Sequence, residues 1–247
     1  MKKTIDFNFL VDKQFNENIN FINNNWILTK INFKRKLYLE LSELNLILID
    51  KSFNEKKDFN KDIFDINIIN ILKTLISISI IHSFKEYELQ AKEIDSTFSL
   101  STLNEEELFS LWSGNIKQSL SFFLESLYEK TNYQNNDSIL NLSENTLLKS
   151  ILFLKNEENH IFYDLLISFF NFLTINELNI NKIFESISIF NQFKNFIKEN
   201  SIYRKNWIYK NNELEDILVF KDLIINENVK PNELILKLKD IYVKKIS

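Results

Sequence analysis

The sequence contains no cysteine, and among its 247 residues there are one glycine, one proline and two histidines. The absence of cysteine excludes disulfides, thiolate zinc sites and cysteine nucleophiles. The scarcity of glycine and proline leaves turns to clusters of Asn, Asp and Ser. Gly, Pro, Ala and Arg have GC-rich codons and are all rare here, whereas the abundant Asn, Ile, Lys and Phe have AT-rich codons. The simplest source of this composition is an AT-rich genome.

Long uncharged runs, which a membrane-spanning helix requires, are also missing. No window of about 18 residues is free of charge, and the most apolar stretch, residues 63–81, contains Asp65 and Lys73. The first residues include two lysines, but Asp6 and Asp12 interrupt the apolar region that a signal peptide needs. We therefore expect a cytoplasmic protein with no membrane partner.

The charge balance is mildly acidic, with a formal net charge of −4 and an isoelectric point near 5.4. A nucleic-acid-binding protein usually carries a basic stripe, so no nucleic-acid partner is expected. The sequence also lacks a glycine-rich phosphate loop and a Ser-His-acid triad motif. We expect no cofactor.

Apolar residues recur mainly every three or four positions, which is the period of an α-helix. Asn104 precedes three glutamates, a pattern typical of a helix N-cap followed by carboxylates near the positive end of the helix dipole. Residues 62–92 are apolar nearly all round in their middle, which predicts a central buried helix. Helices are expected over residues 7–21, 27–50, 62–92, 105–130, 143–155, 157–173, 177–199, 213–226 and 231–245.

These elements predict an all-α fold, an irregular multi-helix bundle of about eight or nine helices in two packed layers. Residues 95–103 are the least helical segment, and the polar stretch 132–137 forms a second break. No repeat of fixed period is present, so a solenoid is not predicted. Because no linker-like composition divides the chain, residues 1–247 are expected to form a single helical domain, with sub-halves 1–131 and 137–247.

Each histidine has an acid four residues further on, His82 with Glu86 and His160 with Asp164, which places each pair on one helix face. We expect a structural role for each histidine, either in a pair within its helix or as a capped core histidine. Catalysis is the alternative, because a carboxylate buried in an apolar run, as Asp164 would be, has a raised pKa. The Glu-x-x-His element of di-iron bundles occurs only once, at Glu157, so no metal site is expected.

Two features of the sequence suggest special backbone or binding roles. The single glycine, Gly114, predicts a tight backbone approach, a close helix crossing or a helix kink. A short segment between predicted helices combines aromatic rings with arginine, a composition enriched at protein-binding hot spots. Its candidate partner-binding residues are Tyr203, Arg204, Trp207 and Tyr209; the alternative is that Trp207 plugs the adjoining helices.

The leading hypothesis is a non-enzymatic protein that binds another protein. Within that class we favour a cytosolic inhibitor or immunity-type protein that neutralises a basic toxin, because an acidic chain attracts a basic partner. The alternative is a structural or scaffold subunit of a larger assembly, and the second alternative is a helical enzyme that uses His160 and Asp164. The identity of the partner, the oligomeric state and any relative motion of the two halves stay open.

Overall fold

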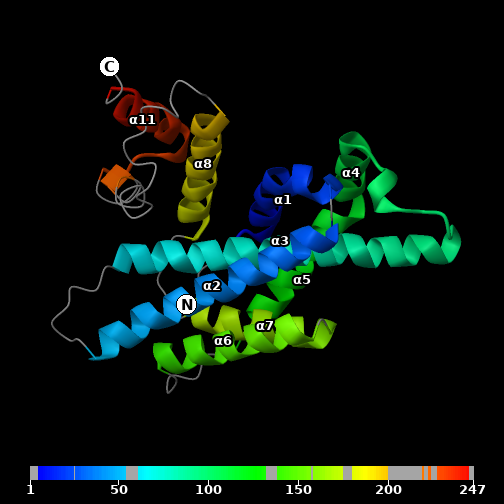
Figure 1. Ribbon diagram of the computed structural model, residues 1–247, viewed down its shortest axis with the longest axis horizontal. Coiled ribbons are helices and arrows are strands. Elements are labelled where there is room, and N and C mark those ends of the chain that lie inside the picture. Colours follow the sequence, from blue (N-terminus) through cyan, green and yellow to red (C-terminus); the bar gives the residue numbers. More distant parts are fainter. Residues whose placement is uncertain are drawn as a thin grey trace. The chain divides into compact units, whose positions relative to one another are not determined.

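The computed structural model describes residues 5–24, 26–53, 61–131, 138–156, 158–174, 180–199, 219, 222–223 and 227–244. Every regular element in this part of the chain is helical (Figure 1). The helices are α1 (Phe7–Asn24), α2 (Trp26–Phe53), α3 (Lys61–Ile94), α4 (Glu105–Leu111), α5 (Lys117–Glu129), α6 (Ile139–Lys155), α7 (Asn159–Thr174), α8 (Ile180–Glu199) and α11 (Pro231–Lys244). The all-α prediction and the expected number of helices are confirmed.

The predicted helix boundaries are close to the observed ones because they depend on local signals. The helix expected over residues 105–130 consists of α4, a π-helical turn η2 (Trp112–Ile116) and α5. The segment 95–103 lacks an α-helix, as predicted, and contains the short 3₁₀ turn η1 (Leu100–Thr102). The helix expected over residues 213–226 falls largely outside the described residues.

The start of α4 shows why its boundary could be predicted. The Asn104 side chain accepts a hydrogen bond of 2.9 Å from the Glu107 amide, and the Glu107 carboxylate accepts one of 2.8 Å from the Asn104 amide. This reciprocal capping box satisfies two amides that the first helical turn leaves without partners. The predicted N-cap at Asn104 is confirmed.

The contacts divide the chain into two compact units. One consists of residues 1–59 and 70–178, and the other of residues 60–69 and 179–247. The break at 132–137 lies inside the first unit, where α5 and α7, on either side of that break, pack together. The expectation of a single domain stays a prediction.

The middle of α3 forms the centre of the first unit. Its side chains from Ile71 to Ile81 are all buried, as the apolar pattern of this segment predicts. Residues Phe64–Ile94 are long and apolar enough to cross a membrane, but 89% of the most apolar window is buried within the protein. This burial is typical of a core helix.

The second unit contains the first turns of α3 together with α8 and α11, which pack against each other. Phe184 and Phe193 of α8 are fully buried, as are Leu234 and Leu238 of α11. In both helices the buried residues recur at the spacing of one helix face. The second unit is therefore built from amphipathic helices, as the sequence pattern predicts.

Gly114 lies in the π-helical turn η2, the kind of irregularity at which helices kink. The prediction of a close approach is wrong, because a Cβ atom built on Gly114 has no neighbour within 4 Å. Its φ angle is not positive, so the backbone does not require glycine either. Gly114 instead lines a surface hollow of about 630 Å³ next to the exposed ring of Phe122.

Replacing Gly114 by alanine is therefore expected to stabilise the protein by about 0.5–1 kcal/mol, because alanine restricts the unfolded chain and favours helix. Urea unfolding followed by circular dichroism measures this change. Ser113→Ala, at the neighbouring exposed position, is the matched control and is expected to change the free energy of unfolding by less than about 0.5 kcal/mol. A destabilised Gly114→Ala variant would contradict the open environment of this residue.

Candidate functional site

The C-terminal half of α3 emerges from the core and changes character there. The side chains up to Ile81 are buried, whereas most of those from Lys85 to Ile94 are exposed. Between these two parts, polar side chains occur among the apolar ones on the face toward α5 and α7. This change in burial along one helix creates a recess with a polar wall.

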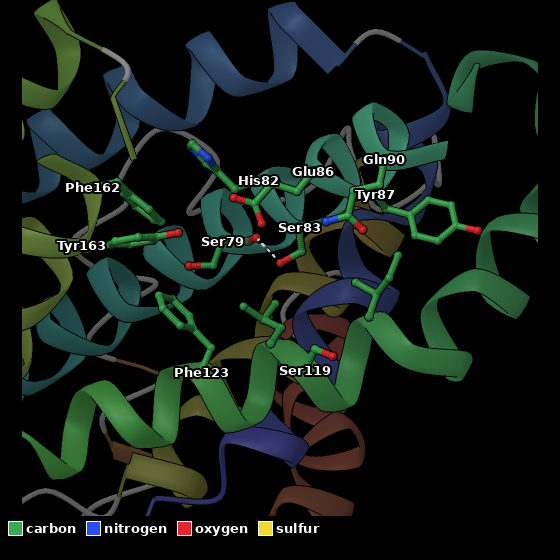
Figure 2. A pocket seen from close by; sticks show the side chains of 12 residues that line it. Ser79, His82, Ser83, Glu86, Tyr87, Gln90, Ser119, Phe123, Phe162 and Tyr163 are labelled. Atoms are coloured by element: carbon green, nitrogen blue, oxygen red, sulfur yellow. Dashed lines mark hydrogen bonds between the residues drawn. The ribbon is translucent and has the colours of Figure 1, made fainter. Parts of the chain in front are cut away.

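The recess has a volume of about 400 Å³ and lies between α3, α5 and α7 (Figure 2). This volume falls in the usual range for ligand pockets, about 300–1,000 Å³. One wall consists of six side chains of α3, namely Ser79, His82, Ser83, Glu86, Tyr87 and Gln90. The opposite side consists of Ile116, Ser119, Leu120 and Phe123 from η2 and α5, and Phe162 and Tyr163 from α7.

Aromatic rings form much of the surface opposite α3. The rings of Phe123 and Tyr163 have centroids 5.0 Å apart and planes at 57°. The Phe162 ring is stacked on the His82 imidazole, with centroids 4.9 Å apart and planes at 6°. These rings pack against one another, so the wall of the recess is formed without a bound ligand.

Glu86 is the only Asp or Glu among the twelve lining residues, and no Lys or Arg lines the recess. Its Oε1 atom accepts a hydrogen bond of 3.2 Å from the Asn159 side-chain amide at the start of α7. Burial, and to a lesser degree the Glu86 charge, raise the pKa of Tyr163. The Tyr163 phenol therefore stays protonated, and its hydroxyl end points toward α3 (Figure 2).

The two serine hydroxyls that α3 contributes to the recess already donate their protons to α3 itself. Ser79 donates to the Leu75 carbonyl at 2.9 Å, and Ser83 donates to the Ser79 carbonyl at 3.1 Å. Neither hydroxyl is thus arranged as a nucleophile with the His82 imidazole as its base, which nucleophilic catalysis would require. Both oxygens retain lone pairs and can accept hydrogen bonds from an occupant.

Within the described part of the chain, neither histidine forms an ion pair with the acid four residues further on. Glu86 accepts from Asn159, whereas the His82 ring lies against Phe162. His160 is exposed, and its Nδ1 atom lies 3.2 Å from Glu158 just before α7. His82 thus packs among aromatic side chains, as a core histidine does.

Asp164 is exposed on α7, so it is not the buried carboxylate that the catalytic alternative requires. The apolar residues on either side of Asp164 point to other faces of α7, and Leu165 and Leu166 are buried. Among the described residues no group of three or more His, Asp or Glu side chains could hold a metal ion. Tyr203, Arg204, Trp207 and Tyr209 lie outside the described residues.

The sequence analysis missed a concentration of negative charge next to the recess. Residues 86–107, which we call the acidic end, contain seven carboxylates and one lysine, Lys92. Their formal charge is −6, whereas that of the whole chain is −4. A running sum of charge along the sequence would have revealed this segment.

Most carboxylates of the acidic end are exposed to solvent. Lys92 pairs with Glu88 at 3.1 Å, but Glu93, Glu105 and Glu106 take part in no ion pair within the described part of the chain. Hydrogen bonds from the Thr97 hydroxyl and amide lower the pKa of Asp95, so this carboxyl also stays charged. The acidic end therefore presents a strong negative field at one place on the first unit.

Comparisons of the chain with protein-family models, with curated proteins and with solved structures give no match. The functional interpretation therefore depends on the recess and the acidic end.

Proposed function

We propose that the protein is a non-enzymatic, cytoplasmic binding protein of the inhibitor or immunity type, which captures and neutralises a basic protein toxin. The acidic end is the observation that carries this proposal. Its formal charge of −6 leaves the rest of the chain with +2, so the negative charge of the protein is local. Such a patch steers an oppositely charged protein toward one surface and speeds association.

The chemistry of the recess supports binding in preference to catalysis. Its two serines on α3 donate to backbone carbonyls, and His160 and Asp164 are exposed and lie in no common pocket. Catalytic groups usually sit in a cleft with perturbed pKa values. The exposed His160 and Asp164 side chains do not have that cleft setting.

A scaffold subunit is the second candidate, and one observation favours it. Leu39 and Leu46 of α2 are about two-thirds exposed, and their seven-residue spacing puts them on one helix face. Exposed apolar side chains that gather on one face mark protein contacts. Light scattering of the purified protein separates the candidates, because a scaffold subunit is expected to assemble whereas an inhibitor is expected to remain a small free species.

The test of the proposed function is neutralisation of a neighbouring gene product. Each protein encoded beside this chain's gene is expressed under an inducible promoter, alone and together with this chain. We expect one neighbour, with a basic surface, to arrest growth and this chain to restore it. Growth arrest by a neighbour that this chain does not relieve, or no toxic neighbour at all, would contradict the proposal.

With the basic protein in hand, charge steering gives a kinetic prediction. Changing Glu93, Glu105 and Glu106 together to Gln is expected to slow association on the order of tenfold at low salt and to leave dissociation nearly unchanged. Stopped-flow fluorescence measures both rates.

The matched control for this triple variant removes three exposed carboxylates outside the acidic end, by changing Glu43, Glu125 and Glu144 to Gln. Both triple variants change the net charge equally. If both slow association to the same extent, total charge governs capture and the acidic end has no special role.

A further inference from the structure

We infer that the recess between α3, α5 and α7 receives a lysine or arginine side chain of the basic partner. This inference rests on the proposed function, and it names the place and the chemistry of recognition. The recess lies at the beginning of the acidic end, because Glu86, Tyr87 and Gln90 belong to both. A partner steered to this surface thus finds a recess of about 400 Å³ beside it.

The aromatic wall suits a cation. Phe123 and Tyr163 present ring faces at an angle of 57°, and Phe162 continues the wall beside them (Figure 2). The face of an aromatic ring is electrically negative, and a cation within about 6 Å of its centre gains about 0.5–2 kcal/mol. Angled ring faces let one cationic group contact more than one ring.

The polar wall presents hydrogen-bond acceptors. The Ser79 and Ser83 hydroxyls donate to carbonyls of α3, so their oxygens face an occupant as acceptors. Glu86 adds a carboxylate, which the Asn159 amide holds through one oxygen. Lysine and arginine head groups are donors with no acceptor, so they match this wall.

An anionic occupant fits the recess poorly. No lysine or arginine is among its twelve lining residues, and Glu86 would repel a second negative charge. A purely apolar side chain would displace water from Glu86 and the serines but could not form hydrogen bonds with them. A basic side chain is the occupant that both walls favour.

The experiment uses two tripeptides with blocked ends as probes, Gly-Arg-Gly and its neutral isostere Gly-citrulline-Gly. Chemical shifts of the isotope-labelled full chain are followed by NMR at about pH 8, where an imidazole is ordinarily neutral. The arginine probe is expected to shift backbone signals of α3, α5 and α7 around the recess. The citrulline probe is expected to bind about tenfold more weakly, because it lacks the charge.

Four variants locate the interaction within the recess. Glu86→Gln is expected to weaken binding of the arginine probe by about tenfold. Glu93→Gln removes an equal charge from the same helix outside the recess and is expected to change binding by less than about twofold. Tyr163→Leu is expected to weaken binding by about two- to fivefold. Tyr163→Phe retains the aromatic ring and is expected to bind the arginine probe as well as the unmodified chain does. Circular dichroism checks that each variant is folded.

Several outcomes would overturn the inference, namely equal binding of the two probes, equal effects of Glu86→Gln and Glu93→Gln, or shifts confined to other surfaces. Its failure is distinguishable from failure of the proposed function. If the chain neutralises a neighbouring toxin but Glu86→Gln and Tyr163→Leu do not weaken that complex, the function stands and the recess is not its site. If the recess binds the arginine probe but no neighbour is toxic, the proposed function fails alone.

Discussion

Replacing Trp112 by alanine is expected to lower the free energy of unfolding by about 3–5 kcal/mol, the usual cost of removing a large buried aromatic side chain. Trp112 is fully buried (0% exposed) and begins the π-helical turn between α4 and α5. Its ring stacks on Phe15 of α1 at 4.4 Å and on Phe84 of α3 at 6.1 Å. Its indole nitrogen also donates to Asp12 of α1 at 3.3 Å.

The expected loss is large because the ring joins three segments of the first unit. Alanine would leave a cavity between α1, α3 and the π turn, and the surrounding helices could close it only by shifting. The change would also remove two aromatic contacts, each worth about 0.5–1.5 kcal/mol beyond the buried area. The substitution therefore combines the cost of a cavity with the loss of aromatic contacts.

Urea unfolding followed by far-UV circular dichroism measures the change in the free energy of unfolding, because this signal reports helix content and not tryptophan. Phe122→Ala is the matched control, since Phe122 is an aromatic residue of the next helix that is 61% exposed. Its loss is expected to cost less than about 1 kcal/mol. If Trp112→Ala costs no more than Phe122→Ala, the stacked cluster does not stabilise the first unit.

Local signals explain how much of this fold could be predicted from the sequence. Asn104 and Glu107 cap α4 through residues three positions apart, so the pattern alone suffices. The apolar residues around Leu72 identify α3 as a buried helix for a similar reason. Helix type and approximate boundaries follow from such short-range patterns.

The recess could not be predicted because its walls meet only when distant helices pack. Phe123 and Tyr163 are 40 positions apart, yet their rings form one wall. Glu86 was expected to pair with His82 four residues before it, but Asn159 of another helix donates to it instead. Periodicity identifies the face of a helix but not the partner that the face meets.

The acidic end, in contrast, can be identified from the sequence alone by counting charged residues. Three of its glutamates were interpreted only as helix-start residues, and they do lie in the first turn of α4. Glu107 has that structural role in the capping box, but Glu105 and Glu106 make no capping contact among the described residues. A residue that satisfies a local rule can thus also contribute to a long-range field.

Changing Glu17 to Gln is expected to destabilise the protein by about 3 kcal/mol at neutral pH, because it removes a counter-charge that lies 3.0 Å from a buried ammonium group. The Lys73 Nζ atom lies 3.0 Å from Glu17 Oε1, and the Lys73 side chain is only 6% exposed. The pair belongs to a polar seam between α1, α2 and α3. In that seam Thr74 also donates to Glu40 at 2.8 Å, and Asn18 donates to Ser77 at 2.9 Å.

The stability lost in the Glu17→Gln variant should depend on pH. The pKa of Lys73 determines whether this loss grows or shrinks as the pH rises. Burial lowers this pKa below its ordinary value of 10.5, and Glu17 opposes that shift. Between the folded pKa and 10.5 the unfolded chain binds a proton that the folded chain has lost, so stability rises with pH through this window. Without the Glu17 charge the folded pKa falls further and the window widens.

The deficit of Glu17→Gln is therefore expected to be largest near neutral pH and to shrink as the pH approaches 10.5. Urea unfolding of both proteins at about pH 7 and about pH 10 measures it. Glu40, whose pKa is raised by burial, acts in the acid range, where its contribution to stability falls as the pH rises above 4.5. A deficit that does not change over the alkaline range would contradict an effect through the Lys73 charge.

The double variant Glu17→Gln/Lys73→Met separates the cost of burying the Lys73 charge from the value of its ion pair with Glu17. With both charges removed, the unfavourable desolvation of Lys73 disappears, and methionine fills a similar volume with apolar atoms. Stability is then expected to return to within about 1 kcal/mol of the unmodified chain. If the two substitutions instead add independently, Glu17 and Lys73 do not interact energetically, and the seam would have to be stabilised by its uncharged hydrogen bonds. A restored double variant would mean that the ion pair contributes little net stability of its own, because its attraction only offsets the cost of burying the charges.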